Sequence, residues 1–221
     1  MRHASPSSSH APAPIVDPAD WTARALEHDV SWGAAQRAAR RCHGCELWRR
    51  STQTVFGSGP QRPRLMLVGE QPGDVEDRSG EPFVGPAGRL LDHALAEAGL
   101  KRGEVYLTNA VKHFSWEARG KWRIHKKPRP GEVRACRPWL LIEIALLQPR
   151  VIVALGSTAA QSLVGPHVRV LRDRGALIAS PLAPALYVTV HPSTLLREPD
   201  DAAREAAFTA FVDDLRRAAN G

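Results

Sequence analysis

The sequence predicts an α/β fold, namely a three-layer α/β/α sandwich around a central four-stranded, mainly parallel sheet. Four short apolar runs carry this prediction, because near-continuous hydrophobic character is typical of strands covered on both faces. Helical patterns lie between the runs, and strand–helix alternation is typical of a parallel sheet with helical crossovers. The four expected strands are 64–69, 105–109, 151–156 and 186–190.

Helical spacing and good helix-forming residues mark the segments around these strands. Residues 21–41 predict two short helices, broken near Ser31 and Gly33. Pro138 is expected to begin or kink the regular part of the helix over 132–148. The other expected helices span 87–99, 157–165 and about 200–219.

The chain has 221 residues, which is enough for one domain with a substantial core. Its start is rich in Ser, Pro and Ala, so we expect a flexible tail over 1–19 and a single domain over 20–221. No apolar run in the sequence is long enough to cross a bilayer, and no apolar signal segment opens it. The sequence therefore predicts a cytoplasmic protein without a membrane partner, with a monomer as the default expectation.

The charge of the chain is positive and unevenly distributed. The formal net charge is +7, and residues 119–137 contain eight Lys or Arg side chains against the single acid Glu132. A basic segment of this kind is typical of proteins that bind an anionic partner such as a nucleic acid. A solvated basic loop is the alternative interpretation, so the place of the segment in the fold decides between them.

Reactive and hydrogen-bonding side chains follow the ends of the expected strands. In open α/β sheets, ligands bind beyond the carboxyl ends of the strands. Surface loops are also polar, but here an acid, an amide and a histidine each stand at the tip of a buried strand. We therefore expect a functional cleft at this edge of the sheet. Its candidate residues are Glu70, Gln71, Asp74, Asn109, His113, His191 and Ser193.

Three segments resemble a known family. “GEQPGDVEDRSGEPFVGPAGRLLD” (69–92), “TNAVKHF” (108–114) and “VHPS” (190–193) closely resemble the iron–sulfur uracil-DNA glycosylases, from about residue 41 to the C-terminus. The first motif is long and contains several glycines and prolines with backbone roles, which argues against a chance match. The resemblance implies a DNA repair enzyme that acts on uracil-containing DNA and releases free uracil.

Two details resemble a narrower group, the UdgX type. They are Gln71 directly after Glu70, and the “RIH” core of the loop “GKWRIHKKP” (120–128). Members of this group resemble ordinary uracil glycosylases but stay covalently attached to the abasic DNA through the histidine of that loop. The commonest form of the loop has an arginine where this chain has Trp122, whose indole can stack on a base.

The resemblance implies roles for three residues around the base, which must be unpaired or flipped into a pocket before it can be cut from its sugar. Asn109 is expected to read the uracil edge, because one amide offers both a donor and an acceptor. Phe83 is expected to stack on the uracil ring, and His191 to stabilise the negative charge on the departing uracil. Their alternatives are a turn residue, a core aromatic and a structural histidine.

The resemblance also implies that His125 is the nucleophile. Neutral imidazole is a competent nucleophile near pH 7, and Glu70 is expected to orient its ring. Gln71 is expected to contact the uracil or its pocket. Asp74 and Asp77, also assigned to the substrate site, are expected to help hold the loop closed, although a solvated loop explains both equally well.

Cations near the cleft are expected to contact the DNA. In the basic loop they would hold the phosphates on either side of the target sugar. Arg197 is expected on a loop that enters the duplex, with Leu195 or Leu196 as an apolar wedge. The cations of the basic loop are Lys121, Arg123, Lys126 and Lys127.

The chain has three cysteines, Cys42, Cys45 and Cys136. An odd number in a cytosolic chain argues against a disulfide framework and leaves metal binding or inert burial. In the ordinary iron–sulfur uracil glycosylases a cysteine stands just after the second strand, where this chain has His113. The resemblance implies a structural [4Fe–4S] cluster held by the three thiols and His113, since histidine can replace cysteine on iron. A zinc site with the same ligands is the alternative that spacing alone allows.

Three functions are open from the sequence. The first is uracil excision that ends in covalent attachment through His125. The second is a conventional iron–sulfur glycosylase that turns over and releases abasic DNA. The third is a non-catalytic iron–sulfur module that binds DNA, and the set of Glu70, Asn109, His125 and His191 argues against it because a binder needs only the basic loop.

Overall fold

A computed structural model describes residues 24, 25, 27 and 30–221 of the chain. The expected tail over 1–19 lies outside the described residues, as does most of the first expected helix. The second begins as α2 (Trp32–Ala39), and the Ser31 hydroxyl caps it by accepting from the Ala34 backbone N–H. The expected break at Ser31 is therefore present, whereas Gly33 lies inside the helix.

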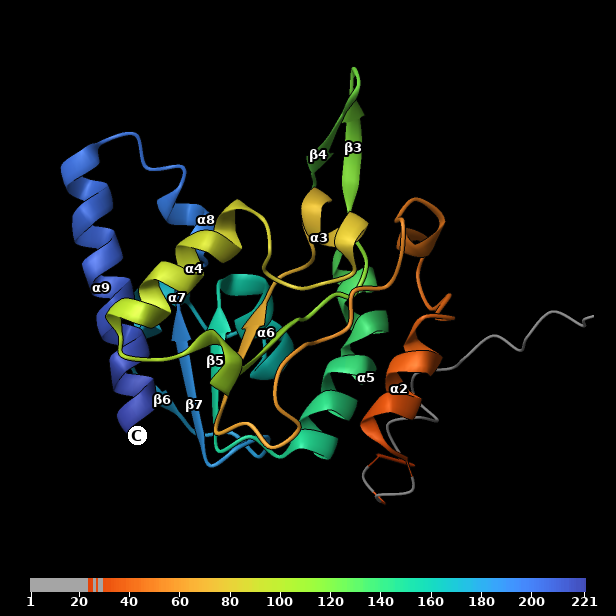
Figure 1. Ribbon diagram of the computed structural model, residues 1–221, viewed down its shortest axis with the longest axis horizontal. Helices are drawn as coiled ribbons and strands as arrows, with labels where there is room; N and C mark the ends of the chain where they lie inside the picture. The colour runs from red at the N-terminus through yellow and green to blue at the C-terminus, as the bar shows by residue number, and fades with distance from the viewer. Residues whose placement is uncertain (1–23, 26, 28–29) are drawn as a thin grey trace, which may run out of the picture.

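The central sheet has five strands in the order β2-β1-β5-β7-β6 (Figure 1). The four expected strands are present and run parallel to one another. The fifth, β6, pairs antiparallel with β7 at the edge, and its two residues are too short to give a sequence signal. The strands are β1 (Leu65–Gly69), β2 (Val105–Asn109), β5 (Val151–Leu155), β6 (Leu177–Ile178) and β7 (Ala185–Thr189).

Helices cover both faces of this sheet, which confirms the predicted three-layer sandwich (Figure 1). Alternate strand residues point to opposite faces, so Leu65 and Leu67 join one core while Met66 and Val68 join the other. The first core is closed by α4 (Pro86–Glu97), α8 (Pro192–Leu195) and α9 (Asp201–Asn220). The second is closed by α5 (Pro130–Leu147) and α6 (Ser157–Leu163).

Pro138 does not begin the regular part of α5, because the helix runs through this residue from Pro130 to Leu147. Proline lacks only one helical hydrogen bond, and burial of the Trp139 and Leu140 side chains in two cores stabilises the helix on both sides. Within the part of the chain described here, no helix is both long and apolar enough to cross a bilayer. The short elements are η1 (Glu46–Arg49), α3 (Asp74–Ser79), η2 (Arg102–Glu104) and α7 (Val170–Asp173).

The first part of the basic segment belongs to a β-hairpin over 116–125, where the sequence predicted a loop. Strands β3 (Trp116–Arg119) and β4 (Trp122–His125) pair antiparallel and project beyond the carboxyl ends of the central strands (Figure 1). The turn is Gly120–Lys121, and Gly120 has φ 59°, a conformation that favours glycine. The period of two places Arg123 and His125 on one face of β4.

A fully buried ion pair joins Lys112 to Glu143 beneath this end of the sheet. The Lys112 ammonium also donates to the Thr108 hydroxyl and to the backbone carbonyl of Asn109, both at 2.7 Å. Glu143 accepts a further hydrogen bond from the Tyr106 hydroxyl at 3.0 Å. The charges are thus paired and hydrogen-bonded, which is the condition for burying them in a protein core.

Replacing Glu143 with Gln leaves the Lys112 charge buried without its counter-ion. We expect Glu143→Gln to lower the free energy of unfolding by about 3–5 kcal/mol. The exposed pair Lys101–Glu104 gives the matched control, and Glu104→Gln is expected to cost less than about 1 kcal/mol. Urea unfolding at pH 7 measures both values. Equal losses in the two variants would contradict a special role for the buried pair.

Candidate active site

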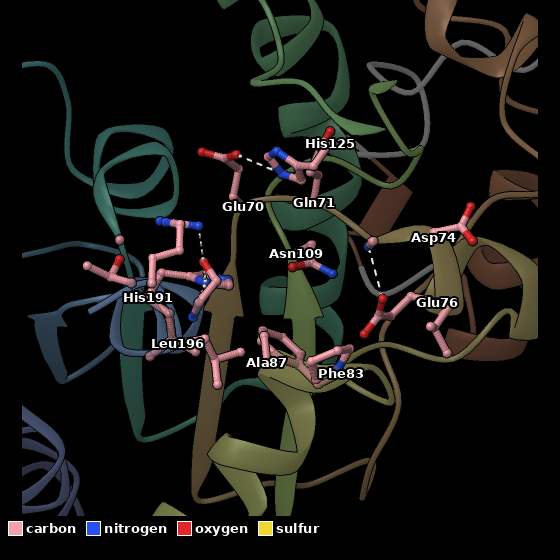
Figure 2. A pocket seen from close by; sticks show the side chains of 18 of the residues that line it. Glu70, Gln71, Asp74, Glu76, Phe83, Ala87, Asn109, His125, His191 and Leu196 are labelled. Carbon is pink, nitrogen blue, oxygen red and sulfur yellow. Dashed lines mark hydrogen bonds and ion pairs between the residues drawn. The ribbon is translucent and has the colours of Figure 1, made fainter. Parts of the chain in front are cut away.

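A cavity of about 680 Å³ opens at the carboxyl ends of the parallel strands. The chain passes from β1 to β2 on one side of β1, then crosses to β5 on its other side, so β1 marks the topological switch point at which such sheets bind ligands. Figure 2 shows His125 and Glu70 at one rim, Phe83 at the opposite side and Asn109 between them. The expected residues that line the cavity are Glu70, Gln71, Asp74, Phe83, Asn109, His125, His191, Ser193 and Arg197, with the wedge candidate Leu196.

Asn109 and Phe83 lie together at the base of the cavity. Asn109 ends β2, and both side chains are buried. Gly69 makes room for them, because a Cβ atom there would stand 2.4 Å from Asn109 Oδ1 and 2.6 Å from Phe83 Cζ. The arrangement sets an amide edge beside an aromatic ring, which suits a flat polar ligand such as a nucleobase.

The backbone of Phe83 is held in an unusual conformation by Glu76. Phe83 has φ 56°, which costs energy in a bulky residue. The buried Glu76 carboxylate accepts hydrogen bonds from the backbone N–H groups of Val84 at 3.1 Å and Gly85 at 2.7 Å. Its other oxygen accepts from the Gly73 N–H at 3.1 Å. Glu76 thus fixes the turn that aims the Phe83 ring into the cavity.

His191 presents a neutral imidazole to the cavity from the end of β7. Burial lowers its pKa to about 4, although the Glu70 carboxylate opposes this shift. Its Nδ1 accepts a hydrogen bond from the Ser193 backbone N–H at 3.2 Å, which assigns the ring proton to Nε2. A neutral ring with a fixed Nε2–H is a donor suited to a developing negative charge.

His125 faces Glu70 across the rim of the cavity. Its Nε2 lies 3.4 Å from Glu70 Oε1, and the His125 side chain is 51% exposed. The second Glu70 oxygen accepts a hydrogen bond from the Thr158 hydroxyl. Burial raises the pKa of Glu70, but the hydrogen bonds from His125 and Thr158 outweigh it and leave this pKa below its ordinary value. Glu70 is therefore a carboxylate at neutral pH.

The hairpin is clamped to α3 through Arg123. Its guanidinium donates to Asp74 at 2.5 Å and to the fully buried Asp77 at 2.7 Å. Asp77 also accepts from the Thr52 backbone N–H at 3.0 Å. Asp74 and Asp77 thus lie where the loop-holding expectation put them, while the Arg123 guanidinium, expected to contact DNA, is committed to these two acids.

Gln71 holds the base of the same hairpin. Its side-chain NH₂ donates to the backbone carbonyls of Ser115 and Lys126, each at 3.1 Å, and its oxygen accepts from the Ser115 N–H at 2.9 Å. The two ends of the hairpin are therefore tied to the residue that follows Glu70. A contact between Gln71 and uracil stays a prediction, and the hairpin contact is one that the sequence did not indicate.

Four of the cations expected to contact DNA are exposed. Arg197 lines the cavity and donates to the Ser193 hydroxyl at 3.3 Å. Of the two wedge candidates, Leu195 is 2% exposed in the core while Leu196 is 46% exposed and lines the cavity. The structure therefore leaves Leu196 as the candidate wedge. The other exposed cations expected to contact DNA are Lys121, Lys126 and Lys127.

The three cysteines lie outside the cavity, where α2 and α5 meet. Cys42, Cys45 and Cys136 belong to one apolar cluster, and burial raises the pKa of the Cys136 thiol to about 12. The Lys112 backbone N–H donates to Cys136 Sγ at 3.1 Å. Among the described residues, no three His, Cys, Asp or Glu side chains converge closely enough to hold a single metal ion.

Hydrogen bonds fix the tautomer of the buried His113 ring. Thr54 donates its only hydroxyl proton to the Ala39 carbonyl at 3.0 Å, so at 2.9 Å it accepts from His113 Nε2–H. That bond leaves the lone pair on Nδ1, and metal-binding histidines commonly donate their other N–H in this way. The fixed tautomer therefore leaves His113 Nδ1 with a lone pair that can bind a metal.

Three residues around the site were not singled out from the sequence. Glu76 lies within the motif 69–92, so the motif was a signal that could have found it. Thr158 contacts Glu70 across 88 positions of the chain, and Lys112 contacts Glu143 across 31. Contacts between such distant residues have no local pattern, so these two roles come from the fold alone.

The depressed pKa of His191 predicts a pH dependence of stability. The unfolded histidine binds a proton near pH 6.5 and the folded one near pH 4, so stability falls as the pH drops between these values. We expect His191→Gln to reduce the slope of unfolding free energy by up to about 1.4 kcal/mol per pH unit. Urea unfolding at pH 4.5 and 6 measures it. The exposed His93 gives the control, since His93→Gln should keep the wild-type slope.

Comparisons with known proteins identify the family of the chain. The family model of the Uracil DNA glycosylase superfamily matches residues 56–216. The Type-4 uracil-DNA glycosylase of Thermotoga maritima is 37% identical over 180 residues, which cover 81% of this chain and 88% of that protein. The Type-4 uracil-DNA glycosylase of Pyrobaculum aerophilum is 37% identical over 167 residues, covering 72% and 82%. The Type-5 uracil-DNA glycosylase of Thermus thermophilus is 38% identical over 151 residues, covering 61% and 64%. This chain belongs to the uracil-DNA glycosylase superfamily.

Proposed function

We propose that this protein excises uracil from DNA and then bonds to the resulting abasic sugar through His125. The excision activity is supported by two Type-4 uracil-DNA glycosylases, which this chain matches over most of their length. The covalent step is supported by one observation above all. The hairpin sets His125 3.4 Å from the Glu70 carboxylate at the rim of the base cavity.

The proposed excision uses the residues at the base of the cavity. A flipped uracil stacks on Phe83, and the Asn109 amide pairs with the base edge. As the bond between C1′ and N1 breaks, its electron pair leaves on the base. His191 Nε2–H donates to the uracil oxygen on which this charge gathers, and a preorganised donor of this kind is worth about 3 kcal/mol. The uracil anion then takes a proton from solvent.

The proposed capture uses His125 and Glu70. The sugar left behind carries positive charge, and a ring-nitrogen lone pair of His125 forms the new bond to C1′. The ring gains one positive charge in this step, and it returns to neutrality by giving its N–H proton to the Glu70 carboxylate. Glu70 thus both orients the ring and balances its charge.

Conventional turnover, with water as the nucleophile, is the second candidate. Its support is the Type-4 relatives themselves, whose names state excision only. The placement of His125 beside Glu70 at the rim of the cavity supports capture over water. Under either mechanism free uracil is released, and we expect a cytoplasmic monomer with no membrane partner.

A denaturing gel tests the covalent step. Protein mixed with a uracil-containing oligonucleotide and heated in SDS should give a shifted band, and a thymine oligonucleotide should give none. His125→Ser removes the nucleophile, so the shifted band should fall below detection while free uracil is still released. His93→Ser, on the exposed face of α4, should retain the wild-type band.

The outcomes separate the candidate functions. A shifted band that survives His125→Ser would overturn the role of His125. Uracil release without any shifted band, giving alkali-sensitive sites instead, would establish conventional turnover. The absence of both uracil release and a shifted band would favour a non-catalytic DNA-binding protein.

We also propose that Cys42, Cys45, His113 and Cys136 hold a [4Fe–4S] cluster. The fixed His113 tautomer and the gathering of the three thiols support this donor set. The cluster would supply a structural link, because its ligands come from the segment before β1, from the end of β2 and from α5. His113 and Cys136 flank the hairpin in sequence, so the link would anchor both of its ends.

Metal analysis tests the cluster independently of activity. Anaerobically purified protein should contain about four irons and four acid-labile sulfides per chain, with visible absorption that Cys136→Ser abolishes. His113→Cys should retain the cluster, since it replaces one ligand by another. His43→Ala is the control, because His43 stacks on Trp48 at 3.9 Å and is not a proposed ligand. One zinc per chain without sulfide would establish the zinc alternative.

A further inference from the structure

Thr158 contacts the Glu70 carboxylate oxygen that does not face His125. It is 6% exposed in the first turn of α6, and its hydroxyl donates to Glu70 Oε2. The other carboxylate oxygen, Oε1, faces His125. The two oxygens of Glu70 therefore have separate partners, one in the protein core and one on the hairpin.

The direction of this hydrogen bond follows from the charge of Glu70. An ionised carboxylate only accepts hydrogen bonds, so the single hydroxyl proton of Thr158 must point to it. Hydrogen bonds to a charged acceptor are about twice as strong as neutral ones. The bond thus limits rotation of a carboxylate whose side chain is 21% exposed and would otherwise turn toward solvent.

The two residues are joined to neighbouring strands of the central sheet. Glu70 follows β1, and Thr158 lies three residues after β5, with Leu65 to Val68 paired in register to Val151 to Ala154. Both strands are buried along their whole length. Thr158 therefore holds Glu70 against the most rigid part of the fold, whereas His125 is carried by a projecting hairpin.

We propose that Thr158 is a positioning residue for the covalent step, acting on His125 through Glu70. This assignment rests on the proposed function. It separates two parts of the reaction, because excision depends on Asn109, Phe83 and His191, while capture depends on the orientation of His125. Loss of the Thr158 hydroxyl should therefore impair capture and spare excision.

Thr158→Val tests this assignment, since valine keeps the shape of threonine and lacks the hydroxyl. In single-turnover reactions with a uracil oligonucleotide, we expect the ratio of covalent adduct to free abasic DNA to fall roughly tenfold. The rate of uracil release should stay within about twofold of wild type. Thr158→Ser restores the donor and should restore the ratio.

A control is available on the same helix. Ser162 of α6 has a buried hydroxyl with no hydrogen-bond partner in the part of the chain described, so Ser162→Ala should leave both the ratio and uracil release unchanged. Thermal unfolding of all three variants checks that they remain folded at the assay temperature.

Each outcome decides the assignment. A Thr158→Val ratio equal to that of wild type would overturn it and leave the covalent step intact. Equal loss of adduct and of uracil release would also overturn it, since that pattern indicates a packing role in the whole site. Wild-type protein that releases uracil and forms no adduct would overturn the covalent step and this assignment together.

Discussion

The buried pair of Lys112 and Glu143 is the constraint on which the rest of the site depends. It joins the end of β2 to α5, and Lys112 also donates to the Asn109 carbonyl and, through its backbone N–H, to Cys136 Sγ. Removing either partner would leave a charge in the core, which is far more costly than losing a surface pair. A single buried interaction therefore fixes the cavity at the strand ends relative to the three cysteines.

The other site residues fall into two groups, those at the ends of the central strands and His125 on the hairpin. Asn109, Glu70 and His191 stand at the ends of buried strands, so the sheet fixes their separations. His125 instead lies on a hairpin that contacts the body through Arg123 and Gln71. Strand ends suit the recognition of a flat base, and a separate hairpin can reach the sugar from the open side of the cavity.

The part of this arrangement that is local in sequence could be predicted, and the part that depends on distant contacts could not. Apolar runs gave the four long strands, and polar residues at their ends gave Glu70, Asn109 and His191. Gly120 and the alternating residues on either side of it could have predicted the hairpin. The basic charge of this segment instead favoured a loop interpretation. The contacts of Thr158 with Glu70 and of Glu143 with Lys112 could not be predicted. Each requires β5 or α5 to lie beside β1 and β2.

These contacts bear on why an imidazole should capture a sugar that water can also reach. His125 is half exposed, so exclusion of water does not protect the proposed reaction. A nucleophile held in the correct geometry has an effective molarity of roughly 10⁵–10⁸ M, which no free solvent molecule can match. Capture then depends on how firmly the ring is held, and the holding contacts are those of Arg123, Gln71 and Glu70. In this view the outcome of uracil excision is set by the anchoring of one hairpin, while the chemistry of the base cavity stays the same.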